Sequence, residues 1–159
     1  MELKTKQREI IHEIIHNTVQ LLELELKKKN ISLVSTIEKD LPIIEADHIE
    51  ITQVITNLLS NAMKYNKGDG KIFIDVFKKK NYVTIAIKDT GIGMKPEETA
   101  KLFNEFYYIK NEKTRGIKET GLGLAIVKRI VDSYHGKVEV ESESGIGTTF
   151  IINLPINNN

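Results

Sequence analysis

The feature of this sequence that most constrains its fold is two pairs of strand-like segments separated by helical ones. Lys71 to Phe77 and Tyr82 to Lys88 are rich in β-branched and aromatic residues, so together they predict a hairpin. Lys137 to Glu143 and Thr148 to Leu154 predict a second hairpin around Gly145 to Gly147. Paired strands with interspersed helices favour an α+β two-layer domain over a parallel βαβ fold.

Helical spacing of apolar residues accounts for most of the remaining chain. Asp47 is placed to cap the second of these helices, and Glu50 completes a capping-box-like pattern three residues later. Gly136 is placed to end the last one. The elements predicted outside the hairpins are a helix from Thr5 to Lys29, a strand from Ile31 to Ile37, a helix from Asp47 to Tyr65, a short helix from Pro96 to Phe106, a loop from Tyr107 to Thr120 and a helix from Leu122 to His135.

Composition excludes several classes of function. The 23 lysines and arginines nearly balance the 22 aspartates and glutamates, which removes the electrostatic argument for a nucleic-acid-binding protein. The chain has no cysteine, which excludes a disulfide scaffold, a thiol nucleophile and a Cys-ligated zinc site. No apolar stretch approaches the roughly 20 residues of a membrane span. We therefore expect one soluble domain over residues 1–159, with no nucleic-acid or membrane contact.

The polar face of the second predicted helix carries the first candidate site. Its apolar residues form one stripe, and Asn57, Asn61 and Lys64 lie on the opposite side. Such a face is most often simply solvated. Asparagine is a mediocre helix former, however, and an amide oxygen can coordinate Mg²⁺ while a lysine one turn further on meets phosphate. The residues alone leave both interpretations open.

Two glycine-bearing segments are further candidates. Asp89 to Gly93 (DTGIG) is either a tight turn after a strand or a carboxylate placed to accept a hydrogen bond from the exocyclic amine of a base. Gly121 to Leu124 (GLGL) opens a helix, where it forms either a hinge or a phosphate site built from backbone N–H groups. Neither segment completes a P-loop or a Rossmann fingerprint.

Five segments, taken in order, resemble the catalytic ATP-binding domain of sensor histidine kinases. This domain belongs to the GHKL superfamily, with type II topoisomerases, mismatch-repair ATPases and a heat-shock chaperone family. NLLSNAMKYN (57–66) is similar to the N box, DTGIGM (89–94) to the first glycine box and LFNEF (102–106) to the F box. TGLGLAIVKRIV (120–131) is similar to the second glycine box, and GIGTTFIINLP (145–155) to the closing signature. The resemblance implies a Bergerat-type α/β sandwich, with a mixed, mainly antiparallel sheet and helices on one face.

The resemblance also implies roles for individual residues. Asn61 would ligate the Mg²⁺ that bridges the nucleotide phosphates, and Asn57 and Lys64 would act in catalysis. Asp89 would accept a hydrogen bond from the adenine amino group, with Thr148 beside it. The complete nucleotide site implied by the resemblance comprises Asn57, Asn61, Lys64, Tyr65, Asp89, Gly91, Ile92, Gly93, Phe106, Thr120, Gly121, Leu122, Gly123, Leu124 and Thr148.

The segment from Tyr107 to Thr120, which the resemblance implies to be a lid over ATP, departs from the family pattern. Tyr108 stands where the family often has arginine. A cationic contact to the terminal phosphate would therefore have to come from Lys110, Lys113 or Arg115.

The implied function is transfer of the γ-phosphoryl group of Mg-ATP to a histidine on a separate helical hairpin. Such a kinase acts in two-component signal transduction, with a response regulator as an indirect partner. The stretch around His12 and His16 lacks the continuation expected after an acceptor histidine, so we expect a kinase fragment without its substrate. Alone it should be a monomer, and it should be cytoplasmic or the cytoplasmic portion of a membrane-bound sensor.

Two alternatives remain open at this point. One is a nucleotide-binding regulatory module without transfer activity. The other is a GHKL ATPase, but those enzymes usually carry a glutamate base at the position of Asn57, so hydrolysis should be slow.

Overall fold

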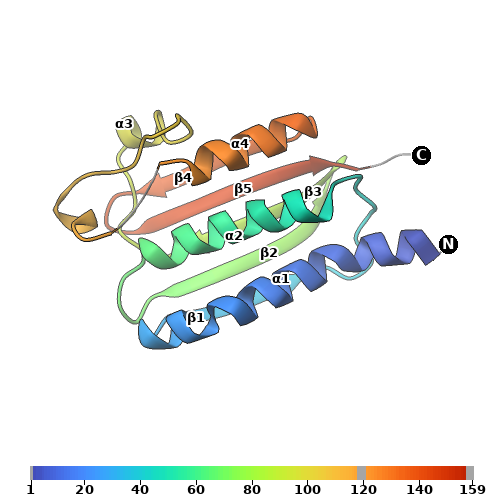
Figure 1. The fold of residues 1–159 in the computed structure, drawn as a ribbon, viewed down its shortest axis with the longest axis horizontal. Coiled ribbons are helices and arrows are strands. Elements are labelled where there is room, and N and C mark those ends of the chain that lie inside the picture. Colours follow the sequence, from blue (N-terminus) through green and yellow to red (C-terminus); the bar gives the residue numbers. More distant parts are fainter. Residues whose placement is uncertain (1, 118–120, 157–159) are drawn as a thin grey trace.

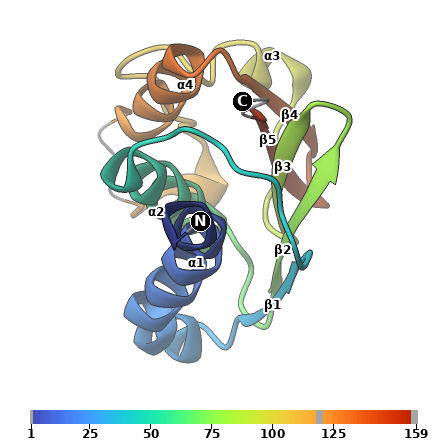
Figure 2. The same cartoon turned by 90° about the vertical axis from the view of Figure 1, so that its right-hand side faces the viewer.

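The computed structural model describes residues 2–117 and 121–156, which form a five-stranded sheet with helices packed on one of its faces (Figure 1). Seen from the side, α1, α2 and α4 form one layer and the sheet forms the other (Figure 2). In chain order the elements are α1 (Glu2–Lys28), β1 (Ser32–Ile37), α2 (His48–Lys64), β2 (Lys71–Lys79), β3 (Tyr82–Asp89), α3 (Pro96–Thr99), the 3₁₀ turn η1 (Glu112–Thr114), α4 (Gly123–Ser133), β4 (Lys137–Glu143) and β5 (Gly147–Pro155).

The sheet is mixed and mainly antiparallel, in the order β1-β2-β3-β5-β4. Both predicted hairpins, β2–β3 and β4–β5, are present, with boundaries within two residues of those expected. The only parallel pair in the described part of the chain is β1–β2, whose connection passes through α2 as parallel pairing requires. The α+β two-layer architecture is thus confirmed.

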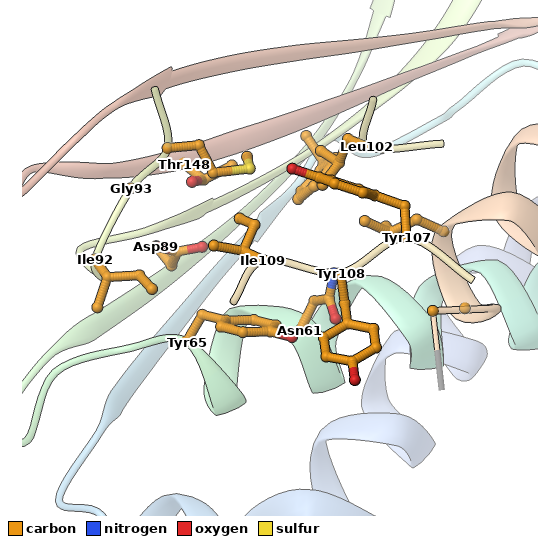
Figure 3. A pocket seen from close by; sticks show the side chains of 15 residues that line it. Asn61, Tyr65, Asp89, Ile92, Gly93, Leu102, Tyr107, Tyr108, Ile109 and Thr148 are labelled. Atoms are coloured by element: carbon orange, nitrogen blue, oxygen red, sulfur yellow. The ribbon is translucent and has the colours of Figure 1, made fainter. Parts of the chain in front are cut away.

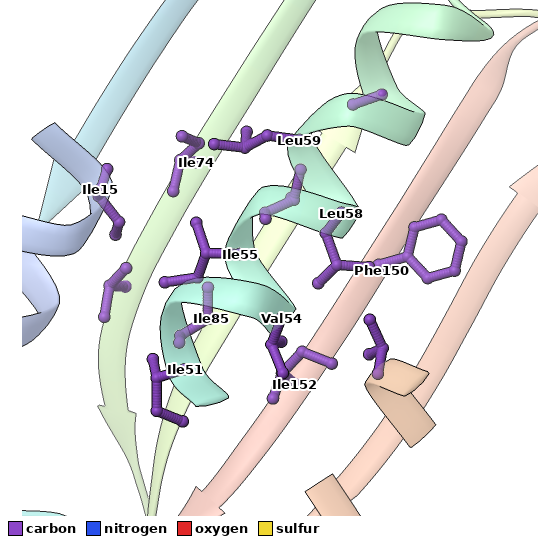
Figure 4. Close-up of a cluster of buried hydrophobic side chains, with 14 of the residues drawn as sticks. Ile15, Ile51, Val54, Ile55, Leu58, Leu59, Ile74, Ile85, Phe150 and Ile152 are labelled. Carbon is purple, nitrogen blue, oxygen red and sulfur yellow. The ribbon is translucent and has the colours of Figure 1, made fainter. Parts of the chain in front are cut away.

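The core lies between α2 and the centre of the sheet. The whole predicted apolar stripe of α2 is buried, and Leu58 and Ile55 are fully enclosed. Figure 4 shows this stripe facing side chains of β2, β3 and β5, among them Ile74, Ile85 and Ile152. Because the stripe fixes which side of α2 faces the sheet, it also fixes where the polar residues of α2 point. No helix in the described part of the chain is long and apolar enough to span a bilayer.

The start of α2 is capped differently from the predicted capping box. Asp47 Oδ1 accepts the N–H groups of Ile49 and Glu50, as expected, but Glu50 does not return to the Asp47 N–H. Instead that N–H donates to the Tyr134 hydroxyl at 2.8 Å, and the hydroxyl donates to Glu50 Oε1 at 2.8 Å. Tyr134, the C-cap of α4, therefore completes the box and joins two neighbouring helices.

The third predicted helix is wrong in length. It ends at Thr99 rather than near Phe106, and the chain continues through turns in which Leu102 and Asn104 bond three residues back. The helix cannot extend to Phe106, because Phe106 adopts a left-handed conformation with φ of 63°. A continuous helix could not include that backbone conformation. Phe103, within the turns, packs edge-on against Phe150.

We predict that Tyr134→Phe will lower the free energy of unfolding by about 1 kcal/mol, because the Asp47 N–H and the Glu50 carboxylate both lose a partner. Denaturant unfolding would measure the change. Tyr82→Phe is the matched control, since it removes a hydroxyl from β3 while keeping the ring beside Lys137. Equal stability of the two variants would contradict the capping role of Tyr134.

Candidate functional site

A hollow opens at one end of the sheet, between the C-terminal end of α2, the segment after β3, the start of α4 and residues 107–109 (Figure 3). Its empty space, together with open solvent at its mouth, amounts to about 610 Å³. Its walls are mostly apolar, with a few polar groups. The lining residues are Asn61, Tyr65, Asp89, Ile92, Gly93, Met94, Leu102, Tyr107, Tyr108, Ile109, Gly121, Gly123, Leu124, Thr148 and Phe150.

Asp89 is the one carboxylate in this wall. It ends β3 directly opposite Thr148 of β5, and only 5% of its surface is exposed. Burial raises the pKa of Asp89 from 3.8 to about 6, while the backbone N–H groups of Gly91 and Thr148 act in the opposite direction by stabilising the ionised form. The Gly91 bond measures 2.8 Å to Oδ1. A buried carboxylate beside an open apolar hollow is suited to accept hydrogen bonds from a ligand.

The segment after Asp89 is fixed on both sides by backbone contacts. The Ile92 N–H donates to the Tyr65 carbonyl at 3.0 Å, and the Ile92 carbonyl accepts the Gly145 N–H at 2.7 Å. A Cβ on Gly91 would lie 2.2 Å from the Tyr65 carbonyl oxygen, and Gly93 has φ of 65°. These two glycines are therefore required by the close approach of the chain to itself. Gly93 and Ile92 line the hollow, whereas Gly91 does not.

The four predicted residues of α2 are placed differently from one another. Asn61 and Tyr65 line the hollow. Asn57 does not; its amide Nδ2 donates to the Gly123 carbonyl at 3.2 Å and so ties the start of α4 to α2. Lys64 lies in the last turn of α2, outside the lining.

The start of α4 contributes Gly121, Gly123 and Leu124 of the predicted site to the lining. Its N-cap residue Leu122 is outside the lining and carries no side-chain oxygen that could cap the helix. A helix N-terminus of this kind is suited to binding an anion. Thr120, also predicted for the site, lies outside the described residues.

Phe106 contributes through its backbone rather than its ring. Its N–H donates to the Gly121 carbonyl at 2.9 Å, which brings the two ends of the intervening segment together. The side chain is 69% exposed and is not part of the lining.

Sequence reasoning missed six apolar or aromatic residues of the wall. Three of them lie inside the motifs quoted above and three in the segment after the F box, where Ile109 extends toward Asp89 (Figure 3). For the three residues inside motifs, the motifs themselves were the signal; for the other three it was the apolar run just after Phe106, in a segment that was predicted as a loop. The six are Met94, Leu102, Tyr107, Tyr108, Ile109 and Phe150.

A second hollow adjoins the first and shares Tyr65, Tyr108 and Ile109 with it. Two of the three candidate cations, Lys110 and Arg115, line this second hollow, and Lys113 does not. The Lys110 Nζ also lies 5.1 Å from the centre of the Tyr108 ring, within the range of a cation–π contact.

Residues 46–158 match the family model described as histidine kinase-, DNA gyrase B-, and HSP90-like ATPase. The chain belongs to this ATPase family. Among curated family members, the sensor protein RprX of Bacteroides fragilis is 36% identical over 156 residues, covering 97% of this chain and 30% of the relative. The sensor protein kinase WalK of Staphylococcus aureus is 38% identical over 133 residues, covering 82% and 32%. The chain thus spans about a third of the length of each of these two relatives.

Solved structures agree with this assignment to the family. The catalytic domain of histidine kinase ThkA superimposes with a TM-score of 0.78 and 31% identity, covering 91% of both chains. Full-length ShkA in complex with AMPPNP gives a TM-score of 0.80 at 27% identity, covering 94% of this chain and 30% of that one. The fold of this chain is therefore that of a histidine kinase catalytic domain.

The raised pKa of Asp89 predicts how stability depends on pH. Between about pH 4 and pH 6 the folded chain holds a proton that the unfolded chain has lost, so the free energy of unfolding falls as pH rises through this window. Asp89→Asn, which carries no charge, should therefore be more stable than the parent at pH 7.5, by up to ~3 kcal/mol for a shift of this size.

The advantage of Asp89→Asn should shrink to near zero at pH 4, as measured by denaturant unfolding at each pH. Asp75→Asn, at an exposed position of β2, is the matched control. An advantage of Asp89→Asn that is the same at both pH values would show that burial of the charge is not its cause.

Proposed function

We propose that this chain binds Mg-ATP and transfers the γ-phosphoryl group to a histidine on a separate helical hairpin, as the kinase part of a two-component system. The observation that carries the proposal is the buried Asp89 carboxylate at the base of an apolar hollow that also includes Asn61 and the start of α4. Membership of the ATPase family and the likeness to the ThkA catalytic domain support it.

The hollow has the chemistry that adenine requires. The base is flat and largely apolar, and Tyr65, Ile92 and Leu102 offer it apolar walls. Its exocyclic amine is a donor, and Asp89 is the acceptor, with the ionised carboxylate already oriented by the Gly91 N–H. Guanine carries a carbonyl at the same ring position, so an ionised Asp89 disfavours it. This arrangement supports selectivity for adenine nucleotides.

A magnesium ion fits the site as part of the nucleotide rather than as a resident metal. The described residues contain no cluster of three or more His, Cys, Asp or Glu side chains that could hold a metal. Mg²⁺ commonly takes one or two protein ligands and completes its shell with phosphate oxygens and water. The Asn61 amide oxygen can be such a ligand, since its side chain lines the hollow.

The remaining residues act by positioning and charge neutralisation, which is most of what phosphoryl transfer requires of a protein. The backbone N–H groups at the start of α4 would hold phosphate oxygens, and Asn57 keeps this helix in place through its bond to Gly123. Lys64 of α2 would contribute positive charge. Tyr108 stands where the family often has an arginine. Lys110 and Arg115, which line the adjoining hollow, would supply the positive charge of that arginine.

The acceptor histidine and the response regulator lie outside this chain in the proposed scheme. A kinase–regulator pair has been seen for ThkA, whose complex with the response regulator TrrA superimposes on 92% of this chain with a TM-score of 0.74. Because this chain spans about a third of the length of RprX and of WalK, the hairpin would be supplied by another part of a longer protein or by a separate one. We infer a cytoplasmic location for the reaction, since ATP is there.

A steady ATPase is the less favoured alternative. Water must be activated by a base for hydrolysis, and Asn57 is an amide whose Nδ2 is already bonded to Gly123. A regulatory module that binds ATP without transfer remains the second alternative, and the transfer assay below separates it from the kinase.

Labelled ATP and the cognate histidine-bearing hairpin, mixed with this chain, should yield an acid-labile phosphohistidine on the hairpin. Asp89→Ala should abolish the label at low ATP, because the carboxylate acceptor of the adenine amine is lost. A hairpin with its histidine changed to glutamine is the matched control. Nucleotide binding with no label on the intact hairpin would favour the regulatory module, and rapid ATP turnover without the hairpin would favour the ATPase.

We predict that Asn61→Ala will reduce the stimulation of ADP binding by Mg²⁺ about tenfold or more, because the metal loses its protein ligand. Calorimetric titration of ADP with and without Mg²⁺ would measure it. Asn81→Ala, in the exposed β2–β3 turn, is the control and should retain the full effect of Mg²⁺. If Asn61→Ala responded to Mg²⁺ as the parent does, another group would be the ligand.

A further inference from the structure

Asn66, the last residue of the segment that resembles the N box, does not line the hollow, and neither does Thr90, which follows Asp89. The two side chains nevertheless meet, because the chain leaving α2 passes beside the segment that follows β3. The Thr90 hydroxyl donates to Asn66 Oδ1 at 3.3 Å. One residue earlier, the Tyr65 carbonyl accepts the Ile92 N–H at 3.0 Å. The end of α2 thus contacts the segment after Asp89 at two points, on the side of the hollow where Tyr65 and Ile92 lie (Figure 3).

The orientation of the Asn66 amide is fixed by two partners that each have a single possible role. The Lys67 N–H can only donate, and it lies 2.8 Å from Oδ1. The Lys71 carbonyl can only accept, and it lies 3.1 Å from Nδ2. A Cβ on Gly70 would lie 2.2 Å from Oδ1, so the amide is also packed closely against the backbone of this turn. The atom of Asn66 that faces Thr90 is therefore an acceptor and not a donor.

The direction of the Thr90 hydroxyl is defined in the same way. Its oxygen accepts the Lys71 N–H at 2.8 Å. Its proton can reach two acceptors, Asn66 Oδ1 at 3.3 Å and the Lys71 carbonyl at 3.5 Å. The Lys71 carbonyl already accepts both Asn66 Nδ2 and the Thr90 N–H, which use its two lone pairs. Asn66 Oδ1 is the nearer acceptor and has a lone pair left after the bond from Lys67, so the Thr90 proton points to Asn66.

The Thr90 side chain belongs to the residue whose following peptide holds Asp89. The N–H of that peptide is the Gly91 N–H, which donates to Asp89 Oδ1 at 2.8 Å. Because Asp89 is buried, the direction of this N–H influences the direction of the carboxylate. A Cβ on Gly91 would lie 2.2 Å from the Tyr65 carbonyl oxygen, so the peptide has little room to move toward α2. A continuous path therefore runs from Asn66 through Thr90 to Asp89.

We infer that Asn66 is a positioning residue for Asp89: through the Thr90 hydroxyl it fixes the peptide whose N–H orients the Asp89 carboxylate toward the base. This inference rests on the proposed nucleotide function. A carboxylate held in one orientation accepts the exocyclic amine of adenine with good geometry, whereas a carboxylate that can turn does so less well. Hypoxanthine carries a carbonyl in place of the amine and gains nothing from this acceptor. Loss of Asn66 should therefore weaken the binding of adenine nucleotides selectively.

The test compares ADP with IDP, which carries hypoxanthine, on the parent chain and on Asn66→Ala with Mg²⁺ present. Direct calorimetric titration measures ADP binding, and displacement of ADP measures IDP binding. In Asn66→Ala the ratio of ADP to IDP affinity should fall about three- to tenfold, the usual effect of one hydrogen bond, while IDP affinity is unchanged. Asn81→Ala, in the exposed turn at the other end of β2, is the matched control and should keep the parent ratio.

Variants of Thr90 show whether Asn66 acts through the hydroxyl. Thr90→Ser keeps the hydroxyl and should keep the parent ratio, whereas Thr90→Val removes it and should lower the ratio as Asn66→Ala does. In the Thr90→Val background Asn66→Ala should lower the ratio no further. If Asn66→Ala does not unfold cooperatively, the comparison of Thr90→Val with Thr90→Ser carries the test.

A merely structural role for Asn66, through its bonds to Lys67 and Lys71, predicts a different result. Asn66→Ala would then weaken ADP and IDP equally, and Thr90→Val would keep the parent ratio. Either of these two observations would overturn the inference.

The outcomes also distinguish this inference from the proposed function. If the parent prefers ADP, and Asp89→Ala removes that preference while Asn66→Ala keeps it, the inference fails and the nucleotide site stands. If the parent binds neither nucleotide with Mg²⁺ present, the proposed function fails and the inference fails with it.

Discussion

Two backbone hydrogen bonds made by one residue, Ile92, join the two layers of this molecule beside the hollow. The Ile92 N–H is bound by the end of α2 and the Ile92 carbonyl by the β4–β5 turn, so a helix and a hairpin far apart in sequence meet at one residue. The neighbouring Asp89 depends on this arrangement, because the same turn of chain presents the Gly91 N–H to its carboxylate. This hydrogen bond offsets part of the free energy needed to bury the ionised carboxylate.

Much of the fold follows from periodicity, because burial on one side leaves a readable pattern. The α2 stripe and both hairpins were predicted within two residues for that reason. The exceptions depend on distant partners. Tyr134 completes the cap of a helix that begins 86 residues earlier in the chain, at His48. The residues around His48 contain no pattern that predicts a hydrogen bond to a hydroxyl so distant in sequence. Phe103, beyond the early end of α3, likewise packs against a distant partner, Phe150.

The candidate site was predictable where chemistry is visible in the residue type. Asp89 and Asn61 carry oxygen atoms that call for a role, and both line the hollow. Apolar lining residues such as Ile109 and Phe150 could equally have belonged to the core, so the sequence could not distinguish residues that line the hollow from residues of the core. Phe106 shows the converse case: it belongs to a motif, yet it is exposed and contacts Gly121 through its backbone N–H.

The two sides of the hollow differ in how firmly they are built. The Ile92 side is braced by backbone bonds to α2 and to the β4–β5 turn. The backbone N–H bonds of residues 107–117, in the described part of the chain, instead join residues only three positions apart. The 107–117 side of the hollow should therefore be displaced more easily than the Ile92 side. A bulkier or differently shaped nucleotide would be accommodated by displacement of the 107–117 side. The Ile92 side would keep the same shape and contact the base in the same way. On the proposed function, recognition of the base would therefore fall to one wall of the hollow and tolerance toward the rest of the ligand to the opposite wall.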